Sequence, residues 1–246
     1  MPAAALPIDE PRPHAGLFVA FEGGEGAGKS TQATLLATRL LAAGHDVVRT
    51  REPGGTPAAE GIREVLLDRA HEGLDDRAEA LLFAAARGDH VARVVRPALD
   101  RGAVVVTDRY LDSSVAYQGV GRGLGIETVE GLSLWATRGL RPDLTVVLDV
   151  DPTVGLGRLG TPDRLESEPA QFHRAVREGF VALAARDPGR YLVLDGTRPA
   201  PELAAEVAAR VDTLLGARAS SVGSAVGSSV ESSVVGVAEQ GSEGSA

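Results

Sequence analysis

Five short apolar runs, rich in valine and leucine, alternate along the chain with longer stretches in which apolar residues return every three to four positions. A short apolar run between polar residues predicts a buried strand, and the longer spacing predicts an amphipathic helix. Strands that alternate with helices in this way form a mostly parallel sheet covered by helices on both faces. We therefore predict an α/β fold whose five strands span residues 17–21, 46–50, 103–107, 144–150 and 191–195.

The first helix is predicted directly after the first strand. Five apolar side chains share one of its faces, and Gly44 is typical of the position that ends a helix. The apolar face consists of Ala33, Leu36, Ala37, Leu40 and Leu41. Further helices are predicted at residues 57–68, 75–100, 126–139, 168–186 and 199–215.

A chain of 246 residues is long enough for one sizeable α/β domain with tails. We place this domain at residues 16–216. Residues 1–15 are interrupted by proline, and we predict that they form a disordered N-terminal extension. Residues 217–246 are rich in serine and glycine, lack aromatic residues and show no sustained period, so we predict a disordered tail.

The charge and composition of the chain limit its partners. The formal net charge is -9 at pH 7 and no basic run is present, which argues against nucleic acid and anionic membranes as partners. The absence of cysteine excludes disulfides, thiolate metal sites and thiol nucleophiles. No apolar run approaches the roughly 20 residues that span a bilayer, and the N-terminal stretch lacks the features of a signal peptide. We expect a soluble, cytoplasmic protein.

The chain contains a single lysine, Lys29, and carries its other cationic side chains on arginine. Lys29 lies in GGEGAGKS (23–30), which matches the pattern GxxxxGK[ST] between a predicted strand and an amphipathic helix. In that context the backbone N–H groups of a glycine-rich loop converge on phosphate oxygens, and the following helix adds its positive end. The lysine then reaches the β- and γ-phosphates, and the hydroxyl of Ser30 is placed to bind Mg²⁺.

These features predict a three-layer P-loop NTPase fold that binds ATP. The predicted ATP-binding residues are Gly23, Gly24, Glu25, Gly26, Ala27, Gly28, Lys29, Ser30 and Thr31. The chain has no asparagine and no second lysine, so it lacks the Asn-Lys-x-Asp element of guanine-specific switches. A classical GTPase is thereby excluded.

Four motifs together resemble those of bacterial thymidylate kinases, in order and in spacing. They are FEGGEGAGKSTQ (21–32), TREPGGT (50–56), LLFAAAR (81–87) and DRYLDSSVAYQGVGRG (108–123). The resemblance covers roughly residues 16–215. It implies transfer of the γ-phosphoryl group of ATP to thymidine monophosphate (dTMP), with Mg²⁺ as cofactor, by a homodimeric enzyme that supplies dTTP for DNA replication.

The acceptor side of such a reaction needs cations opposite the P-loop, because two anionic nucleotides must meet. Arg109 follows the third predicted strand and so lies at the carboxyl edge of the sheet, where open α/β folds bind ligands. The resemblance gives Arg109 and Arg51 the binding of the acceptor phosphate, and Asp108 the organisation of Arg109 and of Mg²⁺ waters. For Glu52 two roles stay open, lining the acceptor site or capping the next helix.

The base and sugar of the acceptor are assigned to two further motifs. Phe83 and Arg87 are four apart on a predicted helix and share a face, which suits a ring stacked on a pyrimidine with a guanidinium beside it. By resemblance, Ser114 and Tyr117 face the base and the sugar, Tyr117 excludes a ribose 2′-hydroxyl, and Gln118 adds a polar contact. The predicted substrate-binding residues are Arg51, Glu52, Pro53, Phe83, Arg87, Asp108, Arg109, Ser114, Tyr117 and Gln118.

A glycine-rich stretch between a strand and a helix, residues 155–168, predicts a short mobile lid. One class of thymidylate kinases has a catalytic arginine inside the P-loop, where this chain has Gly26. The lid offers Arg158, our first choice, and Arg164 in its place. The predicted catalytic residues are Lys29, Arg109, Arg158, Arg164 and Glu25, and the predicted metal-binding residues are Ser30, Glu25 and Glu166.

Two other functions are compatible with a P-loop. One is a kinase for another nucleotide or nucleoside, and the other is a catalytically silent module that binds ATP as a signal. The paired arginines at the acceptor edge argue against the silent module, because an ATP sensor has no use for a second phosphate site.

Overall fold

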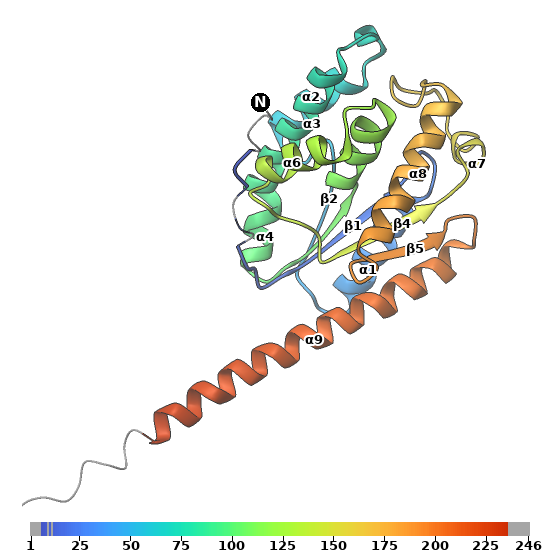
Figure 1. The fold of residues 1–246 in the computed structure, drawn as a ribbon. Helices are drawn as coiled ribbons and strands as arrows, with labels where there is room; N and C mark the ends of the chain where they lie inside the picture. Colours follow the sequence, from blue (N-terminus) through green and yellow to red (C-terminus); the bar gives the residue numbers. More distant parts are fainter. Residues whose placement is uncertain (1–5, 9, 11, 236–246) are drawn as a thin grey trace, which may run out of the picture. The chain divides into compact units, whose positions relative to one another are not determined.

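The computed structural model describes residues 6–8, 10 and 12–235 (Figure 1). The chain divides into two units, residues 1–207 and 208–246. The first unit contains the sheet and the motifs discussed above. The described part of the second unit, residues 208–235, belongs to the last helix.

The sheet has five parallel strands in the order β2-β3-β1-β4-β5. The strands are β1 (Leu17–Gly23), β2 (Val47–Arg51), β3 (Val104–Asp108), β4 (Leu144–Asp149) and β5 (Tyr191–Asp195). All five predicted strands are confirmed, with ends that differ by at most a few residues. The central strand β1 is buried along its whole length, which explains its unbroken apolar run, since both faces of a parallel sheet are covered.

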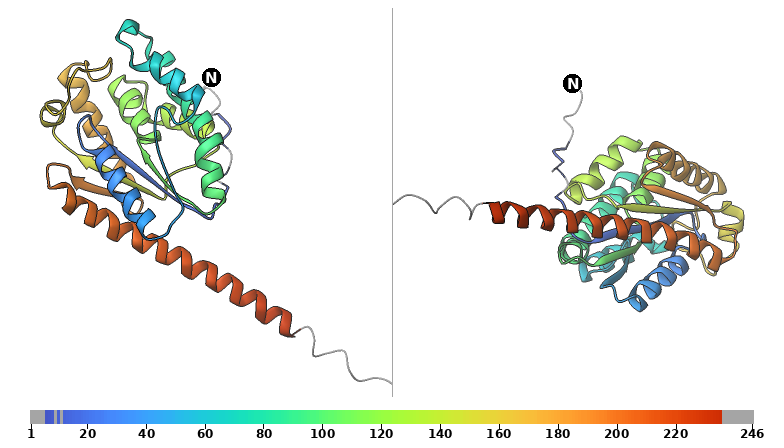
Figure 2. Two further views of the ribbon diagram at one scale, coloured as in Figure 1. Left: turned by 180° about the vertical axis from the view of Figure 1, so that it is seen from behind. Right: turned by 90° about the horizontal axis from the view of Figure 1, so that it is seen from below.

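Helices lie on both sides of the sheet (Figures 1 and 2). The α-helices of the described residues are α1 (Lys29–Ala42), α2 (Pro57–Leu67), α3 (Asp76–His90), α4 (Arg96–Asp100), α5 (Leu111–Ser114), α6 (Ile126–Ala136), α7 (Pro152–Leu156), α8 (Ala170–Arg186) and α9 (Ala200–Val235), the last of which extends from the first unit into the second. Three further turns are the 3₁₀ turn η1 (Arg69–His71) and the π-helical segments η2 (Val91–Val95) and η3 (Val115–Gly121).

Most predicted helices are confirmed. The stretch 75–100 is helical throughout but is built from α3, η2 and α4, with the π-helical segment shortly before Pro97. Proline has no N–H to donate to the preceding turn, and a π-helical insertion is one way in which a helix accommodates such a break. The short segments α5, η3 and α7 were not predicted, and α7 overlaps the start of the predicted lid.

The structure continues α9 to Val235, into the stretch for which we predict a disordered tail. Serine and glycine lower helix propensity, but a helix that has already formed extends one residue at a time without a new nucleation cost. The remaining predicted tail, residues 236–246, lies outside the described residues. Those residues of the predicted N-terminal extension that the structure describes have no regular secondary structure.

The core consists of two layers of side chains, one on each face of the sheet. Phe18 and Ala20 of β1 join a cluster with α4, α5, α6 and α8, while the alternate residues Val19 and Phe21 are buried outside that cluster. Phe18 packs edge-to-face on Tyr110, with ring centroids 4.9 Å apart. Tyr110 lies just after the end of β3, so this contact joins the core directly to the edge of the sheet that carries the motifs.

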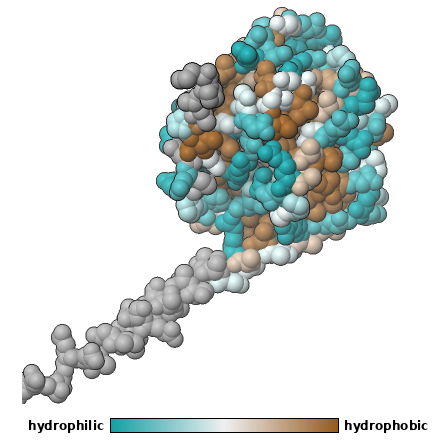
Figure 3. Space-filling model, viewed as in Figure 1, coloured by the Kyte–Doolittle hydropathy of each residue, from teal (hydrophilic) through white to brown (hydrophobic). Residues whose placement is uncertain are grey.

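The outer surface mixes polar and apolar residues on the face drawn in Figure 3. Among the residues that the structure describes, no helix combines the length and apolar content that a membrane span needs.

Neighbouring leucines of α1 test the packing. Leu40 is fully buried, but Leu41, which we predicted on the buried face, is 57% exposed because it lies beyond the edge of the apolar stripe. We expect Leu40→Ala to lower the free energy of unfolding by about 2–5 kcal/mol and Leu41→Ala to change it by less than about 1 kcal/mol. Urea denaturation of the two variants measures the difference, and equal losses would contradict this packing.

Candidate active site

The carboxyl ends of β1, β2 and β3 meet around Asp108. The parallel register pairs Asp108 with Phe21 on one side and with Arg51 on the other. The loops that follow these three strands therefore start side by side, which brings the P-loop, the TREPGG segment and the DRY segment together, as the sequence predicted.

Two cavities open at this edge. The P-loop cavity, of about 570 Å³, is lined by residues 25–31 together with Asp108, Arg51 and Arg158. The inner cavity, of about 110 Å³, is lined by Phe83, Ser114, Tyr117 and Gln118, among others. Five residues line both, so the cavities meet at Glu25, Glu52, Arg63, Arg109 and Glu166.

The P-loop connects β1 to α1 and depends on glycine at two positions. Gly26 and Gly28 have φ angles of 64° and 96°, in the left-handed region that favours glycine. A Cβ at Gly26 would also lie 2.0 Å from the carbonyl oxygen of Gly155. The loop ends at Lys29, the first residue of α1, so the N-terminus of that helix faces the P-loop cavity.

Lys29 folds back over the loop that carries it. Its Nζ donates to the carbonyl oxygens of Gly24, at 2.6 Å, and Gly23, at 3.1 Å. Burial, together with the nearby positive charge of Arg109, lowers the pKa of Lys29 to about 8. A compact ammonium group fits between two carbonyl oxygens where a planar guanidinium does not, which gives a structural reason for the single lysine of the chain.

Ser30 and Asp108 form an oxygen-rich pair at the mouth of the P-loop cavity. The Ser30 hydroxyl donates a hydrogen bond to the Asp108 carboxylate, and both residues line the cavity. Hydroxyl and carboxylate oxygens are the kind of ligand that Mg²⁺ accepts, usually alongside waters and nucleotide phosphates. This pair therefore fits the metal that the sequence predicts.

Arg109 lies where the two cavities meet. Its backbone is left-handed, with φ of 69°, and its guanidinium donates to Glu25 Oε1 at 2.7 Å, to Gly23 O and Ser113 Oγ at 3.1 Å, and to the Tyr117 hydroxyl at 3.3 Å. Burial of Glu25 would raise its pKa, but the charges of Arg109 and Lys29 outweigh burial and lower that pKa to about 2. Glu25 is thus an ionised partner of Arg109.

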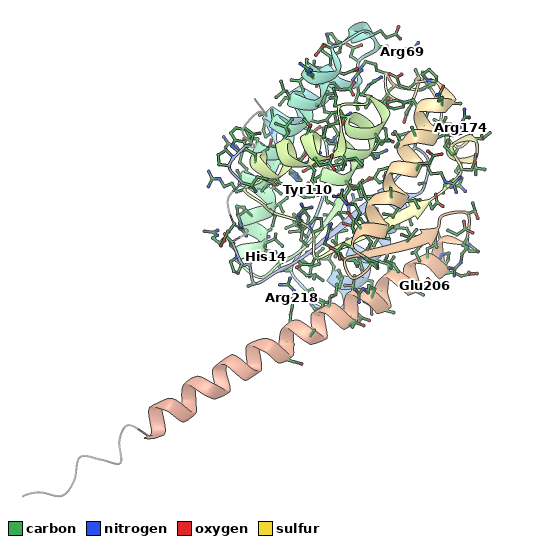
Figure 4. All side chains as sticks on the ribbon, in the orientation of Figure 1. His14, Arg69, Tyr110, Arg174, Glu206 and Arg218 are labelled. Atoms are coloured by element: carbon green, nitrogen blue, oxygen red, sulfur yellow. The ribbon has the colours of Figure 1, made fainter. Side chains whose placement is uncertain are left out.

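Glu22, which none of the sequence predictions included, fixes the turn that carries Arg109. Glu22 is fully buried and accepts hydrogen bonds from the backbone N–H groups of Tyr110, at 2.8 Å, and Ser113, at 3.1 Å, and from the Ser113 hydroxyl. Figure 4 labels Tyr110 in the interior of the fold. Burial and the nearby Asp112 raise the pKa of Glu22 to about 8. A glutamate inside the apolar run LFVAFEG was a signal that could have identified it.

Arg51 and Glu52 lie at the end of β2 and have different partners. Arg51 lines the P-loop cavity and donates to Glu60 at 2.8 Å. Glu52 lines both cavities and is paired with Arg87, so the structure favours the first of its two open roles. The cap of α2 is Thr56, whose hydroxyl accepts a hydrogen bond from the N–H of the third residue of that helix. Pro53, which follows Glu52, lines the inner cavity.

Phe83 and Arg87 share a helix but not a cavity. Phe83 lines the inner cavity, whereas Arg87 is 2% exposed and lines neither of the two cavities. The Arg87 guanidinium donates to Glu52 at 2.7 Å, to the Ser114 hydroxyl at 2.9 Å and to Ser133 at 3.1 Å. Arg87 thus contacts Ser114 and Glu52, which do line the inner cavity.

The π-helical segment η3 brings Tyr117 and Gln118 to the inner cavity. The Tyr117 hydroxyl donates to Glu25 at 2.6 Å. Gln118 donates through Nε2 to Glu79 at 2.8 Å, but its carbonyl oxygen Oε1 is buried and has no partner among the described residues. A buried acceptor without a donor costs about 1–3 kcal/mol, which a ligand in this cavity can recover.

The two arginines of the predicted lid have different surroundings. Arg158 lines the P-loop cavity and donates to the Gly26 carbonyl at 3.0 Å. Arg164 is buried, donates to Leu66 O and Glu79 at 2.7 Å, and lines neither cavity. Glu166 lines both cavities and accepts a hydrogen bond from the N–H of Asp163.

Arg63 is a further cation at the site that the sequence did not predict. It projects from α2, lines both cavities and donates to the Pro53 carbonyl at 2.9 Å. Burial and the positive charges of Arg51 and Arg109 lower its pKa. It belongs to none of the four motifs, so only the fold shows that it lies at the site.

Fixed positive groups surround the junction of the cavities. Lys29 and Arg158 lie on the P-loop side, and Arg63 and Arg109 lie between the P-loop and the inner cavity. Such an arrangement binds two anionic groups near each other and neutralises charge between them, which is what phosphoryl transfer requires.

The pKa of Lys29 predicts how nucleotide binding depends on pH. Because that pKa is about 8, the ammonium form is lost as the pH rises through 8, and a neutral amine does not attract phosphate. We expect the affinity for ATP to be nearly constant below pH 8 and to fall above it by up to about tenfold per pH unit. Calorimetry across this range measures the slope. A Lys29→Arg control should bind weakly but without this pH dependence, and an equal slope in both proteins would contradict the assignment.

Comparison with known proteins agrees with this geometry. The family model described as thymidylate kinase matches residues 21–207. A thymidylate kinase of Leifsonia xyli subsp. xyli is 56% identical over 207 residues, which are 82% of this chain and 96% of that protein. A thymidylate kinase of Deinococcus radiodurans is 54% identical over 195 residues, 78% of this chain and 94% of that protein.

A solved structure shows the same fold. The crystal structure of thymidylate kinase from Ehrlichia chaffeensis superposes with a TM-score of 0.68 at 32% sequence identity, and the match covers 81% of this chain and all of that chain. The resemblance found in the four sequence motifs is thereby confirmed over most of the chain. The chain belongs to the thymidylate kinase family.

Proposed function

We propose that this protein transfers the γ-phosphoryl group of ATP to dTMP, with Mg²⁺ as cofactor. The observation that carries the proposal is the pair of cavities that meet at Arg109 and Glu25. The P-loop cavity offers a phosphate site, and the inner cavity offers an aromatic and polar pocket of the size of a small ring. Family membership supports the choice of substrates.

The donor side is built from the P-loop. Its backbone and the N-terminus of α1 hold the phosphates of ATP. When ATP binds, phosphate oxygens replace the two carbonyl oxygens that accept hydrogen bonds from Lys29 Nζ. Ser30 and Asp108 would hold Mg²⁺, and the ion supplies charge neutralisation between the phosphates. Of the three predicted metal ligands we keep Ser30, and we assign Asp108 in place of Glu25, which is paired with Arg109, and Glu166, which accepts from the Asp163 N–H.

The acceptor side is built around Arg109. We assign the acceptor phosphate to Arg109, Arg51 and Arg63, which lie at or near the junction of the cavities. Phe83 provides an apolar wall for the base, and Ser114 and Gln118 provide polar contacts. Tyr117 is held by Glu25 against the position of the sugar, where a ribose 2′-hydroxyl would meet its ring.

The chemical step needs positioning more than it needs acid–base chemistry. An oxygen of the acceptor phosphate is already ionised, so it attacks the γ-phosphorus without loss of a proton. The P–O bond to ADP then breaks, and charge on the transferred group is neutralised by Lys29 and Arg158. Arg164 is bound to Glu79 and lies outside both cavities, so we assign the catalytic arginine of the predicted lid to Arg158.

We also propose that the protein acts as a cytoplasmic homodimer. Leu81 of α3 and Trp135 of α6 are 57% and 52% exposed, and these two helices pack against each other. Two large apolar side chains on adjacent helices form a surface that a second copy of the chain can cover.

A panel of acceptors tests the proposed function. We expect ADP release, measured in a coupled assay with ATP and Mg²⁺, to be fastest with dTMP among nucleoside monophosphates and nucleosides. Preference for another acceptor would favour the alternative kinase. ATP binding without turnover of any acceptor would favour the silent P-loop module.

Substitution of the two lid arginines tests the catalytic assignment. Arg158→Ala should lower kcat by about 10³-fold or more with little change in the KM for ATP, because its contact forms chiefly in the transition state. Arg164→Ala is the matched comparison, and it should lower kcat less and reduce thermal stability more, since it leaves Glu79 buried without one of its partners. A larger loss of kcat in Arg164→Ala than in Arg158→Ala would instead identify Arg164 as the catalytic arginine.

A further inference from the structure

Glu79 is a buried carboxylate that none of the roles above employs. It lies on α3, is fully buried, and accepts hydrogen bonds from three side chains on other segments. Gln118 donates to its Oε1 at 2.8 Å, Arg122 to its Oε2 at 3.2 Å, and Arg164 to its Oε2 at 2.7 Å. The carboxylate thus connects the wall of the inner cavity with the segment that carries Arg164.

The two arginines keep Glu79 ionised. Burial would raise the pKa of Glu79, but the hydrogen bonds and charges of Arg122, Gln118 and Arg164 outweigh burial and lower it. An ionised carboxylate only accepts hydrogen bonds. The amide of Gln118 must therefore turn its NH₂ group toward Glu79.

The orientation of one end of an amide fixes the other end. With Nε2 held by Glu79, the carbonyl oxygen of Gln118 points away from the carboxylate, and this oxygen is buried without a partner among the described residues. Gln118 lines the inner cavity. The unpaired acceptor thus belongs to a residue of the cavity wall.

We propose that Glu79 is a positioning residue that sets the nucleobase specificity of the inner cavity by holding the Gln118 amide in its acceptor orientation. This inference rests on the proposed function. A base with an N3–H group, thymine or uracil, supplies the missing donor. Cytosine presents an unprotonated N3 acceptor, so two acceptors would face each other and both would stay unpaired.

The contact of Glu79 with Arg164 links the 155–168 segment to the same amide. Leu165, the neighbour of Arg164, lines the inner cavity beside Gln118. In its observed position the segment places Arg164 against an ionised carboxylate, and the same carboxylate orients Gln118. The position of residues 155–168 and the acceptor orientation of the Gln118 amide thus both depend on the Glu79 carboxylate.

The test is Glu79→Gln with Glu168→Gln as a matched control. A glutamine at position 79 can donate as well as accept, so it no longer dictates how Gln118 turns. Glu168 pairs with the same Arg122 at 2.6 Å but is hydrogen-bonded to neither Gln118 nor Arg164 through its side chain. Steady-state kcat/KM is measured for dTMP and dCMP, with thermal unfolding of each variant.

We expect Glu79→Gln to reduce the preference for dTMP over dCMP by about 10- to 100-fold. The change should arise from a higher KM for dTMP and a lower KM for dCMP. Glu168→Gln should keep the preference of the unmodified protein. Glu79→Asp, which keeps the charge, should retain most of it. A folded Glu79→Gln protein that loses activity on both substrates equally would overturn the inference. Absence of dTMP turnover in the unmodified protein would instead overturn the proposed function, and this inference with it.

A second measurement covers the case in which Glu79→Gln does not fold. The unmodified protein should bind dTMP methylated at N3 at least about tenfold more weakly than dTMP, because the methyl group removes the donor that pairs with Gln118. Equal affinity for the two nucleotides, measured by calorimetry, would overturn the acceptor orientation.

Discussion

The ion pair between Arg109 and Glu25 is the contact on which the rest of the site depends. It lies at the meeting point of the two cavities and is mostly buried. Desolvating two charges is costly unless further hydrogen bonds satisfy them, and here Tyr117, Ser113 and Gly23 supply those bonds. The guanidinium is consequently held in place by the protein alone, at the point where the two cavities meet.

Four other arginines near the site differ in their partners. Arg87 and Arg164 are buried, each bound to a buried glutamate, and they hold the walls of the pocket in shape. Arg63 and Arg158 line the cavities and, within the described part of the chain, donate only to backbone carbonyls, which leaves much of each guanidinium to phosphate. The same residue type thus builds the wall of the pocket in one place and offers free donors to the cavities in another.

The fold and the P-loop could be predicted from the sequence because both rest on local signals. Strand runs, helical spacing and the flanks of GGEGAGKS depend on near neighbours in the chain. Roles that depend on distant partners were harder to predict. The ion pair of Arg164 with Glu79 joins residues far apart in the sequence, and Arg63 belongs to none of the motifs. Beyond residue 216 composition and structure differ, since a serine-rich composition predicts disorder whereas α9 extends from its preceding turns to Val235.

The close approach of Gly26 and Gly155 has an evolutionary consequence. A Cβ at Gly26 would lie 2.0 Å from the carbonyl oxygen of Gly155, and a Cβ at Gly155 would lie 2.1 Å from that of Glu25, so the two backbones leave room for no side chain. An arginine cannot be introduced into this P-loop at position 26 by a single substitution, since the α7 backbone already occupies its space. In this chain a side chain at position 26 therefore requires a second change that moves the backbone of α7 away from the P-loop.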